Sequence, residues 1–159
     1  MNKNENRNMR LLRLLFALLL VWLTLIWAAP LLVSAPSAIL QYMGSAVYFF
    51  MDPVCHQLPQ RSLHIAGLPM PVCGRCFFIY LGGTITVGIA VLRNKISAWP
   101  RGIYAILFSL IVIAFVINKV FLQTEYAYLR YAAGFLLGIL LFRLLMETLV
   151  FKEISNKKE

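Results

Sequence analysis

Five residues with metal-binding or redox-active side chains lie close together in the sequence. Residues 52–76 contain every cysteine and histidine of the 159-residue chain, namely Cys55, His56, His64, Cys73 and Cys76. Such side chains are rarely placed near lipid without a partner, because their polar or charged forms are poorly solvated there. The segment is therefore the first candidate for a functional site.

Metal binding is the first chemistry that this segment predicts. Cys73 and Cys76 have the Cys-x-x-Cys spacing that allows two thiolates to bind one ion. Cys55 together with His56 or His64 would complete a tetrahedral set of three cysteines and one histidine. Thiolates are soft ligands, so we expect zinc, with copper(I) or an iron–sulfur centre as the other choices. A catalytic zinc would use three protein ligands and keep one position for water, whereas a structural zinc would use four.

Two other chemistries remain open for the same cysteines. Cys73 and Cys76 lead directly into an apolar run, and the N-terminal dipole of a helix there, together with Arg75, would stabilise a thiolate. A membrane thiol–disulfide or quinone-linked redox protein could use such a pair, with Cys55 as an exchange partner. Alternatively, a disulfide could staple the loop of a non-enzymatic protein that only binds a partner, although three cysteines leave one unpaired. The sequence does not decide whether the protein is an enzyme.

Polar and basic residues accompany the cysteines and could bind an anion. The expected supporting or anion-binding residues are Gln57, Arg61, Ser62, Arg75, Lys119 and Arg130. Their four cationic side chains would form a patch able to hold a phosphate or carboxylate, on an anionic lipid or on a small molecule. The alternative is an ordinary membrane-interface belt, in which Lys119 extends its charged end toward water.

Long apolar runs surround the segment and indicate an integral membrane protein. Hydrophobic residues make up 61% of the chain and charged residues 13%, against about 25% charged in an ordinary soluble domain. A bilayer span needs about 20 apolar residues, and helices suit lipid because they satisfy their own backbone hydrogen bonds. We expect four transmembrane helices, at about residues 11–33, 77–92, 103–121 and 131–150. The expected fold is therefore an all-α four-helix transmembrane bundle, a single membrane domain over residues 1–159.

Residues 37–51 are apolar but too short for an ordinary span. We expect a short interfacial helix there, which leads into a Cys/His loop at residues 52–76. The alternative is a crossing by residues 31–51, which would invert everything downstream. Four spans and a cytoplasmic N-terminus put 11 of the 15 Lys and Arg residues inside, as the positive-inside rule requires. We therefore expect a multi-pass protein of the cell (inner) membrane, with both termini cytoplasmic and the loop on the outer face.

Small residues in the last apolar run predict close helix packing. Gly134 and Gly138 are four residues apart, a spacing that lets two helices approach each other. We expect them to pack within the bundle, against the Gly82–Gly83 pair, rather than to form a dimer. The sequence gives no oligomeric state.

The loop motifs resemble those of a known family. The residues Cys55-His56-Gln57-x-Pro59-x-Arg61-Ser62 and Cys73-x-Arg75-Cys76 are similar to the signature of a small family of prokaryotic integral-membrane proteins of unknown function. The pattern Arg130-x-x-x-Gly134-x-x-x-Gly138 resembles the last helix of that family, and the resemblance extends from about residue 40 to residue 140. It implies no reaction. It does imply that the named cysteine, histidine, glutamine, arginine and serine residues of the two loop motifs act as one site.

Several function classes are excluded by what the sequence lacks. The net charge is +9, but the basic residues flank the apolar runs and form no arginine-rich or aromatic–basic pattern, so we expect no nucleic-acid partner. The sequence contains no Walker loop, nucleophile elbow or His-Glu-x-x-His motif. The expected partner is the lipid bilayer itself.

Overall fold

The computed structural model describes residues 3–94, 99–118 and 127–155, which are mostly helical. The elements in chain order are α1 (Lys3–Val33), α2 (Ala38–Met51), the 3-10 turn η1 (Pro59–Arg61), β1 (Ser62–Ile65), β2 (Leu68–Cys73), α3 (Gly74–Arg93), α4 (Arg101–Val116) and α5 (Ala127–Ser155). The expected all-α class is confirmed, and one short hairpin supplies the only strands within the described ranges.

Within the described residues, three helices are long and apolar enough to cross a membrane. They are α1 over Asn6–Val33, α3, and α5 over Ala127–Thr148. The fourth apolar helix, α4, has 16 residues, fewer than the roughly 20 that a span needs. The structure therefore agrees with the expected membrane protein, whereas the expected number of four spans is not confirmed. The expected end of the third span, residues 119–121, lies outside the described residues.

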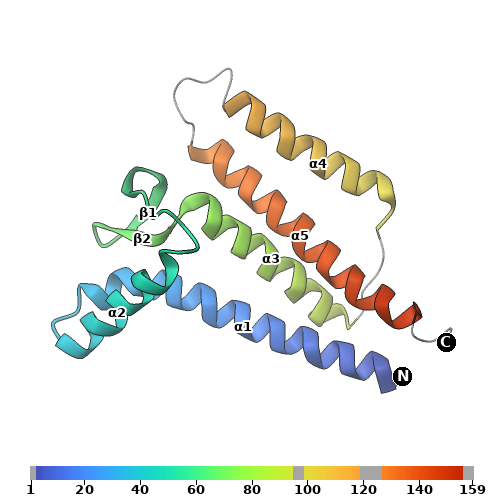
Figure 1. Cartoon of the computed structure of the whole chain (residues 1–159), viewed down its shortest axis with the longest axis horizontal. Helices are drawn as coiled ribbons and strands as arrows, with labels where there is room; N and C mark the ends of the chain where they lie inside the picture. Colours follow the sequence, from blue (N-terminus) through green and yellow to red (C-terminus); the bar gives the residue numbers. More distant parts are fainter. Residues whose placement is uncertain (1–2, 95–98, 119–126, 156–159) are drawn as a thin grey trace.

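The long helices lie side by side in the order α1, α3, α5, α4 (Figure 1). Helix α2 folds back beside the C-terminal part of α1, and the hairpin lies at the same end, where α3 begins (Figure 1). The start of α1 and the end of α5 lie at the opposite end of the bundle (Figure 1). Residues 52–76 are therefore gathered at one end of the helices.

The packing of α5 on α3 depends on glycines. A Cβ atom at Gly134 would lie 2.6 Å from the carbonyl oxygen of Arg75, and one at Gly138 would collide with the carbonyl of Ile79. Only a missing side chain allows such an approach, which is how small residues bring helices together. The two glycines thus pack within the bundle, but they meet Arg75 and Ile79 rather than the expected Gly82–Gly83 pair.

Apolar side chains are buried near both ends of the bundle. One cluster joins α1, α2 and β2 around Cys55 and includes Ile26, Met51 and Val72. The other joins α1, α3 and α5 near the opposite end. The first cluster fixes the hairpin onto the helices, so it also fixes the position of Cys55.

The segment expected to be a Cys/His loop contains a β-hairpin. Strands β1 and β2 pair antiparallel, with Ser62 opposite Cys73 and Ile65 opposite Leu68. Ala66 and Gly67 form the turn and have φ values of 52° and 80°, the positive angles of a type I′ turn. The register places Cys73 at the base of the hairpin, directly before α3.

Candidate metal centre

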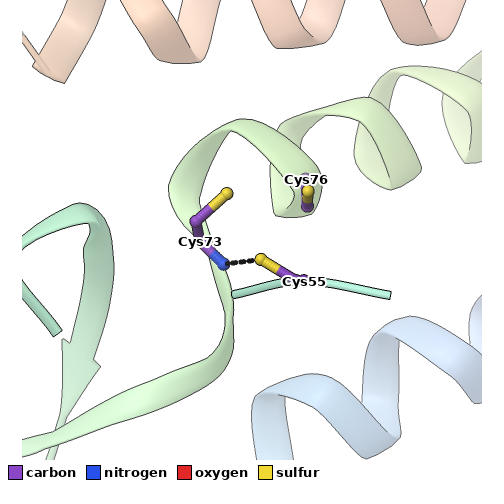
Figure 2. Close-up of side chains that lie close together, drawn as sticks. All are labelled: Cys55, Cys73 and Cys76. Atoms are coloured by element: carbon purple, nitrogen blue, oxygen red, sulfur yellow. Dashed lines mark hydrogen bonds between the residues drawn. The ribbon is translucent and has the colours of Figure 1, made fainter. Parts of the chain in front are cut away.

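Three cysteine side chains meet at the start of α3. The sulfur atoms of Cys55, Cys73 and Cys76 all lie within 4.8 Å of one another. Cys55 follows α2, Cys73 ends β2 and Cys76 lies in the first turn of α3. Figure 2 shows the three side chains close together. All three are free thiols in this structure. The hairpin thus returns the chain to Cys55 after 18 residues and builds one cluster from separate elements.

Backbone hydrogen bonds hold Cys55 in place beneath the other two. Its amide donates to the carbonyl oxygen of Met51 in the last turn of α2, at 2.9 Å. The amide of Cys73 donates to the sulfur of Cys55 at 3.1 Å (Figure 2). Cys55 is 8% exposed, whereas Cys73 and Cys76 are half-buried. Cys55 is therefore the buried member of the cluster, and the other two are the more accessible ones.

The electrostatic environment favours a thiolate at Cys73. The pKa of Cys73 is lowered to about 5, mainly by a hydrogen bond with the thiol of Cys76. Partial burial acts in the opposite direction and raises this pKa. The backbone amides of Cys76 and Arg75 and the thiol of Cys55 lower the pKa further. This lowered pKa favours the thiolate form of Cys73 at neutral pH. The thiolate is the form of cysteine that binds metals and attacks disulfides.

The cluster has the size of a sulfur-rich metal site. Zinc–sulfur bonds of about 2.3 Å place neighbouring sulfurs of a tetrahedral site about 3.8 Å apart. The observed limit of 4.8 Å exceeds that spacing by about 1 Å, which small side-chain rotations can close. Within the described residues, the group contains no histidine or carboxylate. The donor set is therefore three sulfurs, which suits a soft ion such as zinc or copper(I).

A cavity of about 250 Å³ opens beside the sulfurs. Its lining residues are Val54, Cys55, His56, Gln57, Leu58, Arg61, Cys73, Arg75, Cys76, Asn118 and Arg130. Pockets for drug-sized ligands start at about 300 Å³, so this cavity suits a smaller molecule. The three thiols, an imidazole and three guanidinium groups thus share the wall of one small space.

The three arginines of this cavity come from separate elements. Arg61 ends η1, Arg75 lies in the first turn of α3 and Arg130 lies in the first turn of α5. Arg130 is only 7% exposed. Together with Asn118, Arg75 and Arg130 also line an adjoining cavity of about 110 Å³. Buried cations need compensating charge, and the thiolate of Cys73 across the cavity is one source of it.

The other expected site residues have different positions. Gln57 lines the cavity, and its amide donates to a carbonyl of α2 at 2.6 Å. Ser62 is buried and donates to the carbonyl of Leu58 at 3.1 Å, so it fixes the turn before β1 rather than lining the cavity. His64 is exposed on β1 and is not part of the cavity wall. Lys119 lies outside the described residues.

Comparisons with known proteins identify the family. Residues 55–144, more than half of the chain, match the family described as "Predicted membrane protein (DUF2085)". The chain belongs to this family. An uncharacterised protein of Methanocaldococcus jannaschii is similar to it, with 32% identity over 102 residues, which is 62% of this chain and 65% of the relative. The chain thus spans slightly less than two thirds of that curated relative. No solved structure matches it.

The DUF2085 match begins at Cys55 and ends within α5. It therefore includes every residue that lines the cysteine cavity except Val54. It also includes the hairpin, α3 and α4. Helices α1 and α2 precede the matched region.

A second polar group lies at the other end of α3 and α5 and was missed by the sequence reasoning. Arg143 and Glu147 form an ion pair in α5, with 3.5 Å between Nε and Oε1. The hydroxyl of Tyr104 and the backbone amide of Trp99 donate to the same carboxylate. The available signal was a charged pair four residues apart in an otherwise apolar helix. Trp99 and Tyr104 gave no such signal, because the fold alone brings them there.

Proposed function

We propose that this DUF2085 protein binds a soft transition-metal ion, with zinc as the first candidate, through Cys55, Cys73 and Cys76. One observation carries the proposal: three free thiols from separate elements lie within 4.8 Å of one another. Copper(I) or an iron–sulfur centre would suit the same ligands. His56 is proposed as a fourth ligand or proton carrier, supported by its place in the cavity wall. The exposed position of His64 on β1 gives that residue no comparable support.

The cavity supports a reactive site rather than a closed structural one. Three protein ligands would leave one position of a tetrahedral ion accessible from the cavity. When bound, such an ion would act as a Lewis acid and lower the pKa of a bound water. Arg61, Arg75 and Arg130 would hold the phosphate or carboxylate of a small anionic ligand. His56 would accept or donate a proton at the same wall.

We propose further that the two loop motifs are the common site of the family. The residues concerned are Cys55, His56, Gln57, Arg61, Ser62, Cys73, Arg75 and Cys76. Support comes from the family match, which starts at Cys55. In this proposal Ser62 and Gln57 hold the site's backbone in place, because each side chain donates a hydrogen bond to a nearby carbonyl group.

The proposed topology places the cysteine cavity on the outer face of the cell (inner) membrane. It has four spans, with α4 as the third, α2 as an interfacial helix and both termini cytoplasmic. The excess of Lys and Arg on the opposite side supports it. A membrane-impermeant thiol reagent applied to intact cells tests this orientation. Labelling of the cysteines in intact cells is expected, and labelling only after lysis would contradict the outer-face proposal.

Elemental analysis of detergent-purified protein tests the metal site. We expect about one zinc, copper or iron per chain, lost in the Cys73→Ser and Cys76→Ser variants. Val54→Ser is the matched control, because it introduces the same hydroxyl beside Cys55 and removes no sulfur. Cobalt(II) added to the metal-free protein gives a second readout, since thiolate ligation produces a charge-transfer absorption band. Protein that contains no metal and does not develop this band would overturn the proposal.

Thiol–disulfide or quinone-linked redox chemistry is the second candidate. The observation that favours it is the closeness of the Cys73 and Cys76 sulfurs, whose contact lowers the pKa of Cys73 to about 5. A thiol of such low pKa is a good leaving group in disulfide exchange. This candidate predicts no metal and a Cys73–Cys76 disulfide that reducing agents open readily. A free-thiol count beside the metal analysis separates the two candidates.

A further inference from the structure

A second cavity, of about 440 Å³, lies between α3 and α5 away from the cysteines. Much of its wall is apolar and includes Ile85 and Ile89 of α3 and Ile139 of α5. Ile85 is 43% exposed and Ile89 is 48% exposed, so the cavity opens on the apolar flank of α3. Arg93 and Arg143 lie in the wall of the same cavity. The cavity is therefore amphiphilic, with an apolar side and a cationic end.

Arg143 brings a buried positive charge that its neighbours satisfy only in part. It is 6% exposed, and its Nε lies 3.5 Å from the carboxylate of Glu147, beyond ordinary hydrogen-bond distance. Its buried Nη2 has no hydrogen-bond partner among the described residues. The guanidinium carbon lies 4.8 Å from the ring centroid of Trp99. Glu147 also accepts hydrogen bonds from Tyr104 and from the amide of Trp99, so its negative charge is shared.

Among the described residues around this cavity, the charges do not balance. Arg93 ends α3 and is exposed, and it adds a second cation to that of Arg143. Two cations against the one carboxylate of Glu147 leave one positive charge among these three residues. An incompletely paired guanidinium in apolar surroundings is costly, so an anion is the missing partner. Arginine binds phosphate especially well because its planar donors form paired hydrogen bonds.

We infer that this cavity binds an anionic phospholipid. The headgroup phosphate lies at Arg143 and Arg93, and an acyl chain follows the apolar wall of Ile85, Ile89 and Ile139. The site is separate from the cysteine cavity, because Arg93 lies 17 positions after Cys76 in α3, which is about 26 Å along the helix. A basic pocket between transmembrane helices is a known way to hold an anionic headgroup. The two chemical parts of the ligand match the two parts of the cavity.

Lipid titration of the full-length protein in detergent tests the inference. Thermal unfolding and native mass spectrometry are followed during addition of phosphatidylglycerol, of phosphatidylcholine with the same acyl chains, or of inorganic phosphate. We expect phosphatidylglycerol to bind about fivefold more tightly than phosphatidylcholine for each arginine engaged. Inorganic phosphate lacks the acyl chain and is expected to stabilise the protein much less.

Variants locate the binding to the cavity. Arg93→Gln is expected to reduce the preference for phosphatidylglycerol, and Arg143→Gln to abolish it. Ile89→Trp is expected to block both lipids by filling the apolar wall, and it keeps the inference testable if Arg143→Gln does not fold. Arg101→Gln is the matched control, an exposed arginine of α4 that does not line the cavity. Equal binding of the two lipids, equal stabilisation by inorganic phosphate, an unchanged preference in Arg93→Gln, or unchanged binding of both lipids in Ile89→Trp would overturn it.

Discussion

The two ends of the α3–α5 pair carry different chemistry and are built in different ways. At the start of α3, three thiols and three arginines share a small cavity, and most of these residues come from one short segment of the chain. At the other end, Arg143 and Glu147 of α5 meet Trp99 and Tyr104, which are 48 and 43 positions before Glu147 in the sequence. The first end can be recognised as a motif, whereas the second exists only after α4 packs on α5.

The difference also concerns what holds each group of residues in place. The cysteines depend on a local hairpin and on the hydrogen bond from the Cys73 amide to the Cys55 sulfur. The Arg143 group depends on contacts between α4 and α5. Both ends share one requirement, which is the close packing of α3 on α5. Damage to this packing should affect both cavities, whereas damage to one end should leave the other intact.

The largest expected effect is therefore at the glycines of the helix contact. Gly138→Leu would drive a side chain into the carbonyl of Ile79, and the two helices would have to separate. We expect a loss of at least about 3 kcal/mol of folding free energy, or no folded protein. Gly102→Leu is the control, because a side chain at Gly102 meets nothing within 4 Å. Size-exclusion profiles and thermal unfolding in detergent measure the result, and equal stability of the two variants would contradict the packing argument.

Much of the fold could be predicted because lipid leaves few choices. Long apolar runs must form helices, and α1, α3 and α5 follow from that rule. The hairpin could not be predicted in the same way. Pro69 and Pro71 lie within β2, where proline argues against a strand, and Ala66 occupies a turn position that usually needs Gly or Asn. Burial of β2 against α1 overrides both local preferences.

The candidate site was only partly predictable, for a related reason. The motif spacing predicted that Cys55, Cys73 and Cys76 act together, and the sulfurs do lie together. Neither histidine belongs to that group: His56 is exposed and only lines the cavity, and His64 is exposed on β1 and does not line it. The sequence spacing does not contain this information, which depends on how the hairpin twists and pairs.

A smaller but more specific effect is expected from separate damage to each end. Cys55→Ser removes the buried sulfur of the cluster, and we expect metal affinity to fall by more than about a hundredfold, beyond the effect of losing an outer-shell contact. Arg143→Gln changes the other end and should leave metal affinity unchanged. Competition with a chromophoric chelator measures both variants. A similar loss of affinity in both would contradict the independence of the two ends.

The acidity of Cys73 predicts an unusual pH dependence of its reactivity. Its pKa is about 5, so the reactive thiolate should dominate at pH 7, and the alkylation rate should halve only as the pH falls through about 5. An ordinary thiol would instead lose half of its rate near pH 8.5. Cys76→Ala removes the hydrogen bond that lowers this pKa most, so the midpoint should move to higher pH. Mass spectrometry of the alkylated Cys73 peptide in metal-free protein measures the profile, and a wild-type midpoint near 8.5 would refute the assignment.

The smallest expected effect concerns the turn that positions Cys73. Ala66 has a φ of 52°, a conformation that is unfavourable for a residue with a Cβ, so Ala66→Gly should relieve strain in the hairpin. The added freedom of glycine in the unfolded chain offsets part of this gain, and we expect a net stabilisation of up to about 1 kcal/mol. Ala105→Gly, on the exposed side of α4, is the matched control and should lose about 0.5–1 kcal/mol. Thermal unfolding of both variants gives the sign of each change in stability. Destabilisation by Ala66→Gly would mean that Ala66 does not strain the turn at the cysteine end of the protein.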